Sequence, residues 1–160
     1  MPGNFSWVIP RLLAGFAMPG LGGGLPAELE RLRRLGIQCL VSLNQEAAGF
    51  GPACIDAGLD WEYFPVPEFD VPEDETAFDR LVERLLGRMA AGKAVGVHCY
   101  AGVGRSGLLL ACLLGRRLRL PAAEAVRRLR RLRPAIESYA QEEFVRRYLS
   151  RAWPTGAGRP

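Results

Sequence analysis

Short apolar segments that end at proline, glycine or polar residues recur along the first hundred positions of the chain. Continuous apolar runs of about four to eight residues are typical of strands buried inside a sheet. The pattern therefore predicts five strands, at residues 5–9, 12–16, 39–43, 61–64 and 94–98. Pro10 separates the first two, and Pro65 ends the fourth.

Apolar residues spaced three or four positions apart mark the helices. The spacing predicts helices over residues 26–35, 78–89, 106–118, 121–133 and 139–149. In the fourth helix we expect Val126, Leu129 and Leu132 to face inward, and the run from Arg127 to Arg133 to form the solvated outer face. That arginine run is also a candidate guide for an acidic partner.

Strands that alternate with helices predict an α/β fold, with a mostly parallel central sheet flanked by helices on both faces. The length of 160 residues suits one domain. We expect a single domain over residues 1–152 and a disordered tail over residues 153–160.

Composition narrows the class of protein. Hydrophobic residues make up 49% of the chain and charged residues 24%, which is globular rather than disordered. No apolar run approaches the roughly 18 residues of a membrane span, and we expect neither a secretory leader nor a prenylation box. We therefore expect a cytoplasmic monomer that does not bind membranes.

Cysteine, histidine and charge exclude further classes. The four cysteines show no close pairing and are expected to be thiols: Cys39, Cys54, Cys99 and Cys112. A single histidine, His98, and the lack of a Cys-x-x-Cys motif argue against zinc sites and multi-histidine hydrolases. The net charge of +4 suits an anionic substrate but is too small to indicate nucleic acid.

The segment after the fifth predicted strand carries the most chemistry, and three phosphate-handling motifs could explain it. It reads VHCYAGVGRSG from Val97 to Gly107. A Walker loop needs lysine where Arg105 stands. The dinucleotide fingerprint is present as Gly102-x-Gly104-x-x-Gly107, but it also requires a following strand that ends in an acid, and Glu124 lies inside the next predicted helix. Nucleotide binding is therefore disfavoured.

The third motif is Cys-x5-Arg, from Cys99 to Arg105. Glycines within such a loop permit positive φ angles, so that successive backbone N–H groups converge on one anion, and the N-terminus of the next helix adds positive potential. Arg105 can donate two parallel hydrogen bonds to that anion. Thiols in such surroundings ionise readily. We therefore expect Cys99 to attack phosphorus as a thiolate and to form a phosphocysteine intermediate.

A structural cysteine beside a glycine turn is the alternative explanation. Five specified residue types would meet by chance with a probability of about one in ten thousand at average residue usage. The functional interpretation is therefore favoured. Covalent catalysis of this kind needs no metal, and no cofactor is expected.

The segment resembles the His-Cys-x5-Arg-Ser/Thr signature of cysteine-dependent protein tyrosine and dual-specificity phosphatases, and in particular the small atypical enzymes of the VHZ type. The resemblance spans residues 4–148 and also includes Asn4 to Val8, Leu40 to Leu43, and Arg130 to Pro134 with Ile136, Glu137, Tyr139 and Gln141. It implies the protein tyrosine phosphatase fold and phosphorylated proteins or peptides as substrates.

The resemblance also implies roles for individual residues. Cys99 would be the nucleophile, and Arg105 would clamp the transition state. The phosphoryl group would lie among the backbone amides of Tyr100, Ala101, Gly102, Val103, Gly104 and Arg105. Ser106 would stabilise the departing thiolate, and His98 would orient the loop through hydrogen bonds rather than act as a base.

The family takes its general acid from a Pro-Asp-x-x-x-Pro loop, and here the sequence departs from that pattern. The matching stretch is Pro67-Glu68-Phe69-Asp70-Val71-Pro72. Glu68 stands at the expected position and is preferred, with Asp70 as the second candidate. Gln141 matches a position that can help to place the hydrolytic water, and a solvated residue on the last helix is its alternative explanation.

The resulting hypothesis is a phosphatase for phosphotyrosine, with phosphoserine and phosphothreonine admitted to a shallow site. A second hypothesis keeps the chemistry for a phosphoinositide, a nucleotide or an RNA 5′ end. It is disfavoured because the loop carries no extra positive charge at Tyr100, Ala101 or Val103. A third hypothesis is a slow module that mainly binds phosphorylated partners.

Overall fold

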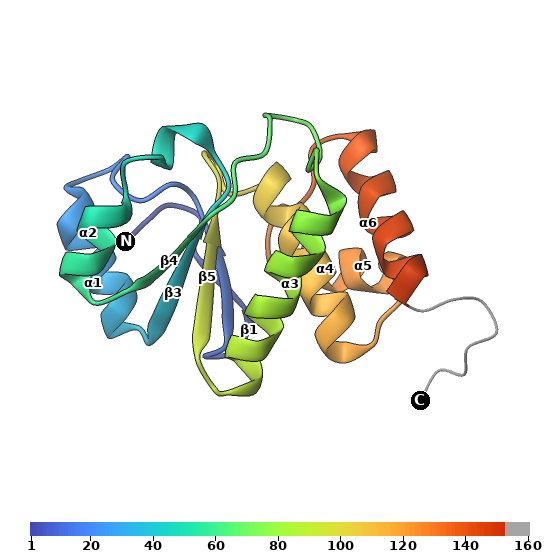
Figure 1. Ribbon diagram of the computed structural model, residues 1–160, viewed down its shortest axis with the longest axis horizontal. Coiled ribbons are helices and arrows are strands. Elements are labelled where there is room, and N and C mark those ends of the chain that lie inside the picture. The colour runs from blue at the N-terminus through green and yellow to red at the C-terminus, as the bar shows by residue number, and fades with distance from the viewer. Residues whose placement is uncertain (153–160) are drawn as a thin grey trace.

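A five-stranded sheet in the order β1-β2-β5-β3-β4 forms the centre of the molecule (Figure 1). The computed structural model describes residues 1–152, so the tail predicted at residues 153–160 lies outside the described residues. The strands are β1 (Ser6–Ile9), β2 (Leu13–Phe16), β3 (Ile37–Ser42), β4 (Asp60–Tyr63) and β5 (Ala94–His98). β1 runs antiparallel to β2 and the other three pairs are parallel, which confirms the predicted sheet.

Helices cover both faces of this sheet, as predicted (Figure 1). The smaller layer consists of α1 (Leu25–Arg34) and α2 (Gly51–Ala57). The larger layer consists of α3 (Glu75–Ala90), α4 (Gly104–Leu118), α5 (Ala122–Leu132) and α6 (Tyr139–Ala152). Each layer encloses its own apolar cluster against the sheet. Within residues 1–152 no helix has the length and apolar character to cross a membrane.

α4 is the central helix of the larger layer. Every residue from Gly104 to Gly115 is buried, because the helix packs against the sheet as well as against α3, α5 and α6. A helix that is apolar on nearly all sides requires such an interior position. Its N-terminus is thereby held rigidly at the carboxyl end of β5, where the candidate site lies.

Two local expectations fail. The apolar spacing does not predict α2 or the short 3₁₀ helix η1 (Gln45–Ala47), because these elements are brief and bury few side chains: Cys54 in α2 and Ala47 in η1. Leu132, expected to face inward, is 50% exposed. It is the last residue of α5, and Arg133 after it adopts an extended backbone, so the helical spacing no longer applies there.

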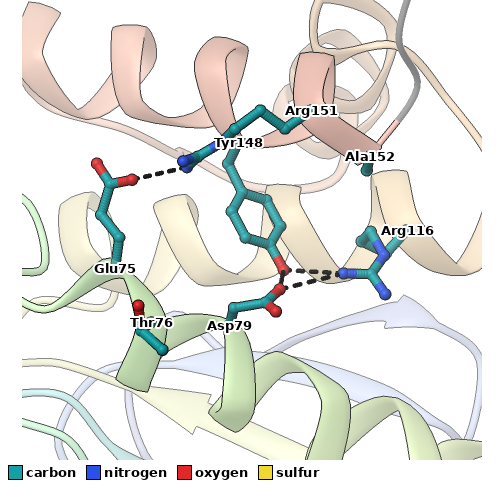
Figure 2. A pocket seen from close by; sticks show the side chains of 7 residues that line it. All are labelled: Glu75, Thr76, Asp79, Arg116, Tyr148, Arg151 and Ala152. Carbon is teal, nitrogen blue, oxygen red and sulfur yellow. Dashed lines mark hydrogen bonds and ion pairs between the residues drawn. The ribbon is translucent and has the colours of Figure 1, made fainter.

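A polar network joins α3, α4 and α6 at the outer end of the larger layer (Figure 2). The hydroxyl of Tyr148 donates to Asp79 at 2.5 Å and accepts from Arg116 at 2.9 Å, while Arg151 pairs with Glu75 at 2.7 Å. Burial, followed by the bond to Asp79, raises the pKa of Tyr148, so the phenol stays neutral. These groups line a pocket of about 370 Å³ but satisfy one another, which makes the network a brace between helices.

Candidate active site

The Cys-x5-Arg segment forms a loop between β5 and α4, at the edge where the parallel strands end. The carboxyl edge of an open α/β sheet is where such folds bind ligands. Cys99 directly follows β5 and is 2% exposed, and α4 begins five residues later at Gly104. The loop therefore encloses the thiol in front of the N-terminus of a buried helix, as the sequence predicts.

Two carbonyl groups of the loop accept hydrogen bonds from backbone N–H groups elsewhere in the protein. The carbonyl of Tyr100 accepts from the backbone N–H of Met18 at 2.9 Å, and that of Val103 accepts from Ile136 N–H at 3.0 Å. Within residues 1–152 the N–H groups of residues 100–103 donate to no protein acceptor. Unpaired amides around a helix N-terminus favour an anion of phosphate size.

Gly102 is required for this shape. Its φ is +77°, and a Cβ at this position would come within 2.5 Å of the backbone of Phe16. No residue with a Cβ fits both the left-handed conformation and the close contact with β2. The glycine at position 102 is therefore explained by the tight packing of the loop against β2.

His98 is fully buried and takes part in a chain of hydrogen bonds. Its Nδ1 lies 2.9 Å from the carbonyl oxygen of Cys99, so this nitrogen donates, and Nε2 accepts from the hydroxyl of Ser42 at 2.6 Å. The indole N–H of Trp61 donates to the same hydroxyl at 3.0 Å. Burial, followed by the charge of Arg105, lowers the pKa of His98 to about 4. The neutral ring thus fixes the start of the loop, and it is not placed to act as a base.

This buried histidine predicts a pH dependence of stability. In the unfolded chain His98 becomes protonated below its ordinary pKa of 6.5, whereas in the folded chain it becomes protonated only below its lowered pKa of about 4. As the pH is lowered from 6.5 to about 4, the contribution of His98 to the free energy of unfolding should therefore fall by about 1.4 kcal/mol per pH unit. Below about pH 4 it should stay constant. Urea unfolding of the wild type and of His98→Asn from pH 4 to pH 7 measures the difference. If the free energies of unfolding of the wild type and of His98→Asn changed equally with pH, the lowered pKa of His98 would be contradicted.

Arg105 and Ser106 occupy the first turn of α4. Arg105 is 7% exposed, and its Nη1 donates to the carbonyl oxygen of Val66 at 3.1 Å. One edge of the guanidinium is thereby anchored, and the group also lines the pocket that contains Cys99. Ser106 is fully buried, and its hydroxyl has no partner within residues 1–152. A buried hydroxyl without a partner is costly, which is consistent with a donor kept for a reacting group.

The two candidate acids differ in where their side chains lie. Glu68 and its neighbour Phe69 line the same small pocket as Cys99 and Arg105, which has a volume of about 30 Å³. The carboxylate of Asp70 instead accepts the backbone N–H of Val71 at 2.8 Å, within its own loop. This geometry supports Glu68 over Asp70.

Gln141 is completely buried, so its alternative explanation as a solvated surface residue is wrong. Its Nε2 donates to the backbone carbonyl of Asp70 at 3.2 Å, while Oε1 accepts from Glu137 N–H at 2.9 Å. A Cβ on Gly104 would lie 3.1 Å from the Gln141 amide. Gln141 therefore connects the acid loop to the start of α4. Glu137 also lines the pocket, a position that its local sequence does not predict.

Arg133 corrects the expectation that residues 127–133 form a solvated face. It is 3% exposed, and its Nη2 donates to the carbonyl of Gly102 at 2.6 Å. Its Nη1 donates to the carbonyls of Asn4 and Gly15. Burial lowers the pKa of Arg133, opposed by the nearby Cys99. Pro134, which ends the helical spacing, is the signal that could have separated Arg133 from the arginines of the helix face.

Cys39, Cys54 and Cys112 are free and buried. Burial raises the pKa of Cys39 to about 12 and that of Cys54 to about 11, and it also raises the pKa of Cys112. Cys54 belongs to the apolar cluster under α1 and α2, whereas Cys99 belongs to the cluster on the other face of the sheet. Cys54 is therefore separated from Cys99 by the sheet.

Comparison with known sequences identifies the family. The protein-family model described as "Swiss Army Knife protein, DSP-PTPase phosphatase domain" matches residues 2–145 of this chain. Human dual specificity protein phosphatase 12 is 36% identical over 72% of this chain and 35% of its own length. Mouse dual specificity protein phosphatase CDC14B is 28% identical over 96% of this chain and 33% of its own length. The chain thus spans about a third of the length of these curated relatives.

Solved structures show the same architecture. Tk-PTP in its active form has a TM-score of 0.81 at 26% identity, covering 94% of this chain and 99% of that one. Kinase associated phosphatase, at 22% identity, has a TM-score of 0.83 and covers 94% and 96%, a likeness that shows the fold alone. The narrower resemblance to the VHZ type stays a prediction. The chain belongs to the dual-specificity and protein tyrosine phosphatase family of cysteine-based phosphatases.

Proposed function

We propose that this protein hydrolyses phosphotyrosine in proteins or peptides, and admits phosphoserine and phosphothreonine, through a phosphocysteine intermediate. The observation that carries the proposal is one pocket lined by Cys99, Arg105 and Glu68 in front of the unpaired amides at the start of α4. The relatives named as dual specificity protein phosphatases support it.

The first chemical step is transfer of the phosphoryl group to sulfur. The thiolate of Cys99 attacks phosphorus, and the bond from phosphorus to the leaving oxygen breaks as the Glu68 carboxyl group donates its proton to that oxygen. Arg105 and the loop amides hold the three remaining oxygens, where charge accumulates in the transition state. The dephosphorylated alcohol or phenol then leaves.

The second step returns the enzyme to its starting state. The Glu68 carboxylate takes a proton from water as the water oxygen attacks phosphorus and the sulfur–phosphorus bond breaks. The hydroxyl of Ser106 donates a hydrogen bond to the departing thiolate. Gln141 holds the acid loop through the carbonyl of Asp70, and so keeps Glu68 positioned for both steps.

The rim of the pocket supports the choice of substrate. The pocket is small and lies near the surface, and two aromatic side chains border it: Phe69 is 56% exposed and Tyr100 is 45% exposed. Exposed aromatic faces favour an aryl group beside the phosphate. A shallow site does not require the length of tyrosine, so serine and threonine phosphates also reach the thiol.

The proposal is tested by turnover and by trapping. Wild-type protein is assayed at equal concentrations of an aryl phosphate, phosphotyrosine and phosphoserine peptides, a phosphoinositide and an RNA with a 5′ phosphate. We expect the aryl and phosphotyrosine substrates to react fastest. Acid quenching during turnover should leave one phosphoryl group on the peptide that contains Cys99, seen by mass spectrometry. Preference for the lipid or RNA would overturn the substrate class, and binding without turnover would indicate a phosphate-binding module.

Replacing each candidate acid by its amide tests which of the two is the proton donor. Glu68→Gln should lower kcat for a phosphoserine peptide by roughly 10²-fold or more, because an alkoxide leaves poorly without a proton. The loss should be smaller for an aryl phosphate with an acidic phenol, and the descending limb of the pH–rate profile at high pH should disappear. Asp70→Asn is the matched control and should retain both the rate and that limb. The reverse pattern would reassign the acid to Asp70.

A further inference from the structure

A groove separate from the candidate active site lies between α5 and α6, which we call the α5/α6 groove. It has a volume of about 490 Å³, within the range of roughly 300 to 1,000 Å³ found for pockets that bind ligands. Its floor is apolar, formed by Ala122, Ala123 and Val126. Its rim carries one carboxylate, Glu142, and four arginines: Arg127, Arg130, Arg131 and Arg146.

The positive charge of the rim is only partly neutralised. Arg127 pairs with Glu124 on the same helix, and Arg146 pairs with Glu143. Arg130 lies 3.8 Å from Glu142, a long ion pair between exposed side chains. Arg131 is exposed and makes no hydrogen bond or ion pair within residues 1–152. An apolar floor with surplus arginine around it is suited to an acidic ligand that carries an apolar side chain.

We propose that the α5/α6 groove binds an acidic segment of a partner protein, which places a large apolar side chain over Val126 and its carboxylates against the arginine rim. Burial of the apolar side chain supplies attraction that is independent of charge. The arginines supply orientation and faster association, and they are well suited to bidentate contacts with carboxylates. The segment needs no phosphate for this contact.

Other occupants fit the groove less well. A second copy that met the groove face to face would set one arginine rim against another, which is unfavourable. A membrane surface presents its anionic groups in a plane and has no side chain to fill a recess between two helices. Nucleic acid matches the charge but leaves the aliphatic floor unused, since base recognition relies on aromatic platforms and polar contacts.

The groove and the catalytic pocket share no lining residue. One short connection links their walls: Arg130 donates to the carbonyl of Ala135 at 3.1 Å, and the next residue, Ile136, donates to Val103 in the catalytic loop. Changes to the exposed ends of other rim residues should therefore alter binding at the groove and leave the chemistry intact.

The experiment selects peptides from a random display library on immobilised wild-type protein, with free phosphate present to occupy the catalytic loop. The selected peptides should be acidic around a large apolar residue. Their affinity for Arg127→Glu/Arg131→Glu should fall by at least about tenfold and should weaken with salt. The matched control is Arg80→Glu/Arg117→Glu, which makes the same change in net charge at exposed arginines without ion pairs in residues 1–152. It should bind within about twofold of wild type.

Selection of no peptide, or of peptides without net negative charge, would overturn the proposal. Equal loss of affinity in both double variants would overturn it too, as would tighter binding of a polynucleotide or of anionic vesicles than of the selected peptides. A concentration-dependent dimer that Arg127→Glu/Arg131→Glu abolishes would assign the groove to a second copy instead. Ala123→Asp, which adds charge to the exposed floor, should also abolish peptide binding. Turnover of an aryl phosphate by all these variants should match wild type, which confirms that they fold.

Discussion

Cys99→Ser is expected to reduce kcat/KM for an aryl phosphate by at least about 10⁴-fold, because a serine hydroxyl is a much poorer nucleophile than the sulfur in the proposed attack on phosphorus. The loop that surrounds residue 99 depends on Gly102, Arg133 and His98 and not on the sulfur. The variant should therefore fold normally and still bind vanadate or a phosphotyrosine peptide. Initial rates and isothermal titration calorimetry measure the two properties.

The control for this substitution is another buried cysteine. Cys54 is fully buried in the cluster on the opposite face of the sheet, and Cys54→Ala should retain turnover even if it lowers stability. Equal turnover by wild type and Cys99→Ser would refute the nucleophile. Loss of both turnover and anion binding in Cys99→Ser would show that the loop had collapsed, and would contradict its independence from the sulfur.

Arg133→Leu is expected to have the second largest effect, on both stability and rate. Arg133 occupies the buried space beneath the loop and donates to the carbonyls of Asn4, Gly15 and Gly102. Leucine removes the arginine donors from these three acceptors, and the long bond of 3.5 Å from the Asn4 side chain to the Gly102 carbonyl replaces them only weakly. The free energy of unfolding should therefore fall by about 3 to 5 kcal/mol. Displacement of Gly102 would also misplace the amides proposed to hold the phosphoryl group, and kcat should fall by roughly a hundredfold. Chemical unfolding and steady-state kinetics measure both.

Matched substitutions keep this prediction testable if Arg133→Leu fails to fold. Arg133→Lys retains the charge but replaces the planar fork by one ammonium group, which cannot reach all three carbonyls in the same geometry. It should fold with reduced kcat and little change in KM. Arg131→Leu, on the exposed side of the same segment, should alter stability by no more than about 0.5 kcal/mol. Full activity in Arg133→Lys and Arg133→Leu would contradict a positioning role.

The parts of this molecule that the sequence predicts depend on local pattern. Four of the five strands are short runs of mostly apolar residues, whereas β4 alternates acidic and aromatic residues over Asp60–Tyr63. The long helices repeat at their own period, so the strands and these helices could be placed from neighbouring residues alone. The Cys99-to-Arg105 loop was equally accessible, because its thiol, glycines and arginine are contiguous. α2 was missed because seven residues with one buried side chain carry too little periodic signal.

The parts that the sequence does not predict depend on contacts between distant positions. Ser42 and Trp61 support His98 from two other strands, and nothing in their local pattern distinguishes them from ordinary sheet residues. Gln141 contacts a loop 71 positions earlier in the chain. Arg133 sits at the end of an arginine run whose other members are exposed, and only the extended backbone after α5 turns it inward.

The contacts of Arg133 have a consequence for when the candidate site forms during synthesis. They tie the loop at Gly102 to Asn4, which lies 129 positions earlier than the arginine itself. Contacts of such large sequence separation form late, because the intervening chain must first become ordered. The phosphate cradle should therefore assemble only after α5 has been synthesised and docked. A ribosome-bound chain that stops before residue 133 would hold the nucleophile yet remain catalytically silent, so activity would appear only once the fold is nearly complete.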